Sequence, residues 1–225
     1  MRLNSGLPNV ANNFYSKKNL ADVTLPSYFI YKLAERHGLT LFETFREPLP
    51  GRNWPVRIDC SAKSTTILND VHPTSNKCFL NYGASLLYVL SEHGEIIAEE
   101  RRFGQEETNH NALANKVYMA GDIYIERSND KKFLGTLVVN NKSGSFYPHQ
   151  PMNFIFFCLI LLKFGLIKYA NLHNFKLRFD FLSINQENAT MIKEYQLGGL
   201  ANLTPEEIDT YIVGLPCHLF SCLNT

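Results

Sequence analysis

The sequence carries no surplus of either charge. Lysine and arginine number 22 against 21 aspartates and glutamates, which gives a formal net charge of +1. Proteins that hold nucleic acid by its phosphates usually show a strongly basic stretch or face. The balance therefore predicts that nucleic acid is not a partner of this protein.

Cysteine is scarce as well, with five in 225 residues. No Cys-x-x-Cys occurs, and the closest pair, Cys217 and Cys222, has no second pair to match it. A disulfide framework needs a regular set of cysteines, and a zinc site needs paired ligands. We therefore expect reduced thiols and no bound metal.

Long apolar runs are missing. The most hydrophobic segment covers only residues 154–162 and ends at Lys163, whereas a membrane span needs about 20 residues. Pro151 before it and Gly165 after it are typical of the two ends of a helix in a globular protein. The sequence thus predicts a buried helix from Pro151 to about Phe164 and no membrane span.

The N-terminal segment lacks the apolar core of about 7–15 residues that a signal peptide needs, so no cleavable signal peptide is predicted. Residues 1–23 contain scattered Asn, Ser, Gly and Pro, which predicts an irregular arm. Residues 24–225 contain no linker or internal repeat, and they are predicted to form one domain.

Within that domain, strands are expected in the middle of the chain with helices around them. Thr204, Pro205 and Glu207 match a capping box, which predicts that a helix begins there. The pattern as a whole predicts an α+β fold with a mainly antiparallel sheet flanked by helices. The expected elements are helices over 26–37, 151–164 and 205–213, hairpins formed by 86–90 with 95–98 and by 117–125 with 133–139, and a strand over 175–181.

Three short motifs lie between residues 88 and 164. They are a loop containing His110, the Ala-Gly-Asp-Ile stretch over 120–123, and Asn-Lys-Ser-Gly-Ser-Phe-Tyr-Pro over 141–148. With a hairpin before them and a helix after them, they resemble a small β-rich domain that recurs in bacterial secreted effectors and toxin-associated proteins. Ser145 departs from the pattern, which usually has His there, so a site that depends on that imidazole is missing or altered here.

The resemblance implies a setting more than a chemistry. It implies a protein that leaves the bacterial cytoplasm and acts in the host cytosol by binding a host or cognate protein, with no cofactor. Two alternatives stay open, and both are enzymes. One is an ADP-ribosyltransferase-like toxin that modifies a host protein with NAD, and the other is a thiol-dependent hydrolase.

The transferase alternative depends on Arg46, on Ser64 at the start of a polar run, and on Glu107 at the end of a Gln-x-Glu. These residues look like the Arg, Ser-Thr-Ser and Gln-x-Glu elements of that toxin superfamily, in the right order. The interval between Arg46 and Ser64 looks short for the superfamily. Glu107 also lies in a mixed-charge run, which is typical of a solvated face.

The hydrolase alternative would use Cys60, which lies between a Pro-rich loop and a polar stretch, whereas Cys158 is expected to be an inert core residue. A thiol nucleophile needs a nearby base. His110 and His149 are candidates for acid–base work, because they lie in two loops that can meet in the fold. A histidine in a loop is more often merely solvated than catalytic.

The corner at 141–148 has two interpretations. As architecture, Asn141 and Ser143 bond neighbouring backbone, and Gly144 takes a positive φ to turn the chain from a strand toward the helix. As a binding site, the same residues join Tyr147 and His149 to present a ligand-facing loop.

Overall fold

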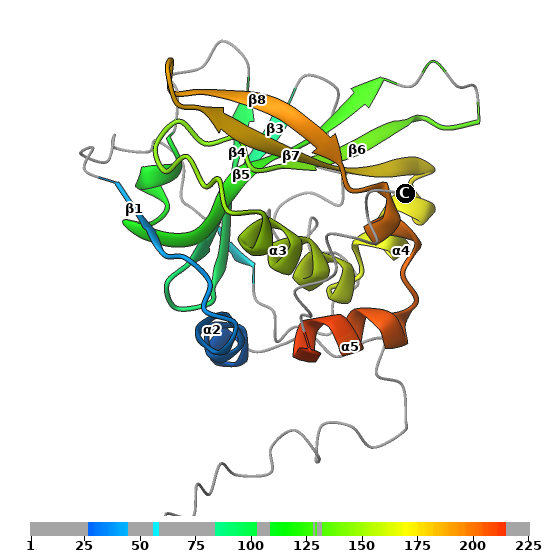
Figure 1. Ribbon diagram of the computed structural model, residues 1–225. Helices are drawn as coiled ribbons and strands as arrows, with labels where there is room; N and C mark the ends of the chain where they lie inside the picture. The colour runs from blue at the N-terminus through cyan, green and yellow to red at the C-terminus, as the bar shows by residue number, and fades with distance from the viewer. Residues whose placement is uncertain are drawn as a thin grey trace, which may run out of the picture.

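The computed structural model describes residues 27–44, 56–58, 84–102, 109–127, 129 and 132–214. Its centre is one eight-stranded mixed sheet in the order β2-β4-β3-β5-β6-β7-β8, with β1 paired to β5 off this path (Figure 1). The prediction of an α+β fold with a mainly antiparallel sheet is confirmed. The strands are β1 (Phe42–Glu43), β2 (Val56–Ile58), β3 (Ala84–Ser91), β4 (Ile96–Arg102), β5 (Lys116–Arg127), β6 (Gly135–Asn140), β7 (Phe175–Asn185) and β8 (Thr190–Gln196).

The predicted helices and hairpins are present with small shifts at their ends. The capping box closes as expected, because Thr204 N donates to Glu207 Oε2 at 2.8 Å and Glu207 N donates to Thr204 Oγ1 at 3.2 Å. The helices are α2 (Ser27–Arg36), α3 (Pro151–Lys163), α4 (Leu166–Leu172) and α5 (Pro205–Gly214), with short 3-10 turns η2 (His110–Ala112) and η3 (Gly198–Asn202).

One pair of strands departs from the antiparallel pattern that the sequence predicts for most of the sheet. β6 and β7 pair in parallel, with Gly135 opposite Phe175 and Asn140 opposite Asp180. Parallel neighbours cannot be joined by a tight turn, so the chain crosses over through α3 and α4. The sheet is otherwise paired antiparallel.

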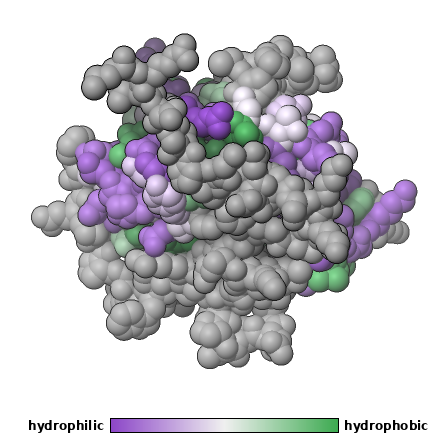
Figure 2. Space-filling view, turned by 90° about the horizontal axis from the view of Figure 1, so that it is seen from below, coloured by the Kyte–Doolittle hydropathy of each residue, from purple (hydrophilic) through white to green (hydrophobic). Residues whose placement is uncertain are grey.

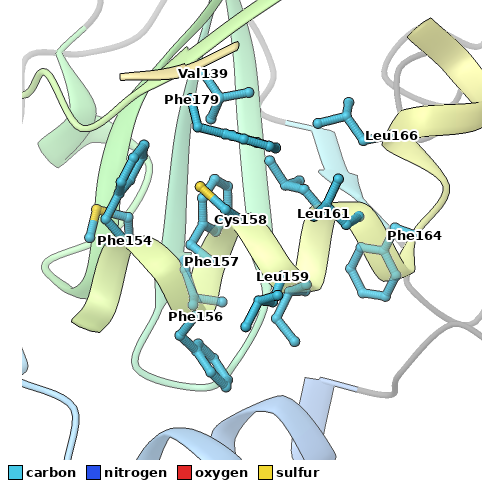
Figure 3. Packing of buried hydrophobic residues seen from close by; sticks show 14 of the residues in the cluster. Val139, Phe154, Phe156, Phe157, Cys158, Leu159, Leu161, Phe164, Leu166 and Phe179 are labelled. Atoms are coloured by element: carbon cyan, nitrogen blue, oxygen red, sulfur yellow. The ribbon is translucent and has the colours of Figure 1, made fainter. Parts of the chain in front are cut away.

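Helix α3 lies across one face of the sheet and is the centre of the larger core. Its residues from Phe154 to Leu161 are all fully buried. The ring of Phe157 stacks on Tyr88 of β3 with a centroid distance of 4.1 Å. Figure 3 shows Phe157 and Cys158 near the sheet residue Phe179, while Phe156 points the other way, toward α2. A helix buried on all sides explains why its sequence is apolar without an amphipathic stripe.

The end of α3 is fixed by an ion pair. Lys163 Nζ lies 2.6 Å from Asp209 Oδ1 of α5, and the Lys163 side chain is buried.

Among the described residues no single helix is long and apolar enough to cross a membrane. Helices α3 and α4 reach that length and composition only together, and they meet at a bend of 60°.

Helices α2 and α5 lie below α3 in Figure 1. Seen from below, the coloured residues are mostly hydrophilic, with smaller hydrophobic areas between them (Figure 2). The buried side of α2 consists of Ile30, Leu33 and Ala34, and that of α5 of Ile208 and Ile212. These two helices therefore cover α3 with their apolar sides.

Shortening a side chain in α3 is expected to cost substantial stability. Leu159→Ala or Ile155→Ala should lower the free energy of unfolding by about 2–5 kcal/mol, because each removes buried surface and leaves a cavity. Both side chains are 0% exposed. Urea unfolding followed by circular dichroism measures the change, with Leu172→Ala, at an exposed leucine of α4, as the control. A loss below 1 kcal/mol for both α3 variants would contradict this assignment of the core.

The other face of the sheet has an apolar half and a charged half. The apolar half is a second core, made by Phe42, Leu87, Val89, Ile97, Leu113, Val117, Ala120 and Phe146. In the charged half, Arg178 of β7 reaches across β6 to Glu126 of β5, with Nη2 2.8 Å from Oε1, and also bonds Asp180. Val138 of β6, which lies opposite Arg178, is fully buried. The ion pair thus links β7 to β5 across the intervening strand β6.

Candidate functional site

The three motifs of the sequence meet in space. Turn η2 places His110 against the middle of β5, where its Nε2 lies 2.9 Å from Gly121 O. The corner after β6 contacts the same turn, with Ser145 Oγ 3.5 Å from Asn111 Oδ1. Residues that are far apart in the sequence therefore form one polar cluster at the end of β6, and this cluster is the candidate site.

Gly121 is the point of closest approach in this cluster. It lies inside the continuous strand β5. A Cβ at this position would lie 1.9 Å from Asn140 O and 2.8 Å from Tyr88 Oη. Tyr88 occupies the space that a side chain at position 121 would need, because its hydroxyl donates to Asn140 O at 2.7 Å. Burial raises the pKa of Tyr88 well above its usual value, so this hydroxyl keeps its proton and acts as a donor.

Asn140 and Asn141 fix the end of β6 with their side chains. Asn140 Oδ1 accepts from Asp122 N at 3.2 Å and from Lys142 N at 2.8 Å. Asn141 Nδ2 donates to Leu182 O at 2.8 Å and to Pro148 O at 2.7 Å, and its Oδ1 accepts from Leu182 N at 2.7 Å. The amide of Asn141 thus continues the ladder to β7 beside the β-bulge at Phe181/Leu182, and Asn141 has no exposed surface.

The turn itself differs from the prediction at Gly144. Gly144 has no positive φ, and a Cβ there would meet nothing within 4 Å. The left-handed residue is Tyr147, with φ of 47°. Tyr147 N donates to Ser143 O at 3.0 Å and Phe146 N donates to Ser143 Oγ at 3.4 Å. The expectation of strain at Gly144 was wrong because these bonds close the turn later, at Tyr147.

The two candidate histidines have different surroundings. His110 is 6% exposed, and since a carbonyl only accepts, its Nε2 carries the proton donated to Gly121 O. The same Nε2 lies 3.7 Å from Asp122 Oδ1. His149 is exposed; its Nδ1 lies 3.0 Å from Tyr147 O, and its ring meets Phe42 edge-on at 5.6 Å. His110 is placed to hold η2 on β5, whereas His149 faces the solvent.

Four residues on which the two enzymatic alternatives depend lie outside the described part of the chain. This applies to Arg46, Cys60, Ser64 and Glu107, so the transferase and the thiol hydrolase stay predictions. Cys158 is fully buried, and burial raises the pKa of its thiol well above the usual value, which agrees with an inert core residue. Within the described ranges, no three His, Cys, Asp or Glu side chains come together in a way that would hold a metal ion.

The sequence did not single out Asn140 or Asn153, which have the same function as Asn141. Asn153 Nδ2 donates to Thr40 O and to Tyr118 O, both at 2.6 Å, and its Oδ1 accepts from Thr40 N at 3.2 Å. The signal for Asn153 was present, because an amide inside the most apolar helix needs buried partners. Asn140 gave no such signal, since it stands at the end of a strand and its side-chain bond to Asp122 N of β5 joins residues 18 positions apart.

In comparisons with protein-family models, with curated proteins and with solved structures, the chain matches none of them. The interpretation of the site therefore depends on its own geometry.

Proposed function

We propose that this protein acts by binding another protein through the corner at residues 141–148 and the adjacent His149. The observation that carries the proposal is the conformation of Tyr147. It is a half-buried tyrosine with φ of 47°, and a bulky residue in the left-handed region is an outlier that costs free energy. Such strain often accompanies function.

The two sides of the corner differ in a way that fits a binding loop. On the inner side, Asn141 and Ser143 are buried and bond the backbone. On the outer side, Lys142, Gly144 and His149 are exposed around Tyr147. A loop held in one conformation loses little entropy on binding, and tyrosine is among the residues that contribute most at protein interfaces.

The setting that we propose comes from the resemblance of the three motifs to bacterial secreted effectors. On that basis the partner is a host or cognate protein, met in the host cytosol after export. Acid–base chemistry at His110 receives less support, because this imidazole is buried and bonded to Gly121 O. A general base must come within hydrogen-bond reach of its substrate.

The test compares the proteins that the parent chain captures with those captured by a variant that keeps the conformation of the loop. Tyr147→Asn removes the ring but suits a left-handed residue, since asparagine tolerates that region. The full chain and its Tyr147→Asn variant are used to enrich proteins from host-cell lysate, and affinity is then measured for proteins that only the parent chain retains. We expect binding to fall about 30-fold or more, as at an interface hot spot.

Two controls make this result specific. Tyr28→Asn changes a tyrosine of α2 that is 69% exposed and should leave binding unchanged. Thermal melts should show that Tyr147→Asn is at least as stable as the parent chain, because it relieves backbone strain. Equal capture by the parent chain and by Tyr147→Asn would contradict the proposal.

A further inference from the structure

Strand β8 forms one edge of the sheet. It comes last in the strand order and, among the described elements, pairs with β7 alone (Figure 1). It has seven residues, whereas β2 at the opposite end of the order has three. Its residues Thr190, Ile192 and Lys193 are exposed. Natural edge strands are commonly short or covered, because a long open edge presents backbone groups on which another strand pairs.

The hydrogen bonds of β7 show which backbone groups of β8 point outward. Leu182 N donates to Asn141 Oδ1 at 2.7 Å and Leu182 O accepts from Asn141 Nδ2 at 2.8 Å, so both groups of Leu182 point away from β8. Lys193 lies opposite Leu182. In an antiparallel pair that exchanges no hydrogen bonds, both residues direct their backbone groups away from each other. The N–H and C=O of Lys193 therefore point off the open edge.

The neighbouring residues of β8 follow by alternation, because successive residues of a strand direct their backbone groups to opposite sides. Ile192, opposite Ser183, directs its groups to β7, and Met191 directs its groups outward. A bond further along supports this assignment, since Leu197 N donates to Phe179 O at 2.8 Å. Phe179 and Ser183 are an even number of positions apart, so both face the β8 side.

The open edge is thus symmetric about Ile192. Met191 and Lys193 on either side of it offer the same outward donor and acceptor, and the Ile192 side chain is 51% exposed. A second copy of the strand, turned antiparallel, places Met191 opposite Lys193 of the copy and Lys193 opposite its Met191. Each of these pairs exchanges hydrogen bonds, and the two Ile192 residues form the pair between them, in which side chains come closest.

The charges also favour this register. Lys193 Nζ lies 3.3 Å from Asp180 Oδ2, in a cluster where Glu126 and Asp180 balance Arg178 and Lys193. Sliding the copy by two residues would set Lys193 against Lys193, and like charges directly opposite are destabilising. The register centred on Ile192 sets Lys193 against Met191 instead. With a net charge of +1 for the whole chain, two copies repel each other only weakly.

We propose that two copies of this chain pair through β8 about a two-fold axis at Ile192, which joins their sheets into one. A two-fold contact of this kind is self-complementary and closes at two subunits. A contact between two edge strands is expected to bury less than the about 1,200 Å² at which stable interfaces begin, so the dimer is weak. The contact lies outside the corner at 141–148 and does not depend on the function proposed for it.

The test is sedimentation equilibrium of the full chain over about 1 μM to 1 mM, which covers the range of weak complexes. A reversible equilibrium between monomer and dimer is expected. Ile192→Lys sets two ammonium groups opposite each other and should raise the dissociation constant about 30-fold or more. Met191→Pro removes one outward N–H from each copy, a change that an edge strand tolerates, and should raise the dissociation constant about tenfold.

Two matched control variants separate this contact from general effects. Leu172→Lys makes the same apolar-to-lysine change at a residue of α4 that is 73% exposed, and it should dimerise like the parent chain. Ile192→Pro removes the N–H that points to β7, so it should lower the melting temperature clearly more than Met191→Pro does. Thermal melts also confirm that Ile192→Lys folds.

Several results would overturn the proposal. The first is a chain that stays monomeric over the whole concentration range. The second is a dimer that persists unchanged in Ile192→Lys and Met191→Pro, or that Leu172→Lys weakens equally, because the contact is then not made by β8. The third is an equal melting temperature for Met191→Pro and Ile192→Pro, because the backbone groups of Met191 then do not point outward.

Discussion

Gly121→Ala is expected to destabilise the protein by about 3 kcal/mol or more, at the upper end of what overpacking a core costs. The added methyl group would lie 1.9 Å from Asn140 O, which is backbone and cannot rotate away. Relief requires β5 and β6 to separate or Tyr88 to give up its bond to Asn140 O. Urea unfolding measures the loss, and the same variant should free the Tyr88 ring, visible as a change in near-ultraviolet circular dichroism.

Gly144→Ala provides the matched control. Like Gly121→Ala, it adds one methyl group to a glycine of the three motifs. This methyl group meets nothing within 4 Å, and Gly144 has no positive φ. Its stability should stay within about 0.5 kcal/mol of the parent chain. If Gly121→Ala were as stable as Gly144→Ala, the close approach of β5 and β6 would not exist as described.

Asn141→Ala is expected to cost about 3 kcal/mol or more. It leaves Leu182 N, Leu182 O and Pro148 O without their bonds to the Asn141 amide, and each buried polar group that loses its partner costs about 1–3 kcal/mol. Asn141→Asp keeps the shape and the acceptor for Leu182 N but cannot donate when ionised. It should be at least as destabilising at neutral pH, with a smaller deficit in acid, where the carboxyl regains one donor.

Chemical denaturation at two pH values measures both Asn141 variants. Ser145→Ala is the control in the same corner, because it removes only a 3.5 Å contact with Asn111 and should change stability by less than about 0.5 kcal/mol. Hydrogen exchange adds a local readout, since Leu182 N should lose protection in Asn141→Ala. Full protection of that amide would show that Asn141 does not hold β7.

Features that depend on neighbouring residues could be predicted from the sequence. The capping box at Thr204 and Glu207 requires only residues three positions apart, and it forms as expected. The apolar run of α3 predicted a buried helix, because an apolar segment too short to span a membrane is removed from water in a core. The mainly antiparallel α+β fold followed from these elements.

The candidate site could be predicted only in part. The motif residues His110, Gly121 and Asn141 all belong to the cluster, but the sequence assigned the turn strain to Gly144 instead of Tyr147. Glycine permits a positive φ without requiring one. Which residue adopts it depended on the bonds of Ser143 to Phe146 N and Tyr147 N.

By itself the sequence determined helices α2, α3 and α5, strands β3 to β7, and the burial of α3, since propensity, capping and apolar runs act over a few residues. It did not indicate α4 or β8. Three contacts were decided only in the tertiary structure. They are the parallel pairing of β6 with β7, the close approach of Gly121 to Asn140 O, and the bonds of the Asn141 side chain to Leu182. These join residues that are up to 41 positions apart. The contacts of β6 and Asn141 with β7 depend on α3 and α4 carrying the chain back to the sheet, and no local pattern encodes that distance.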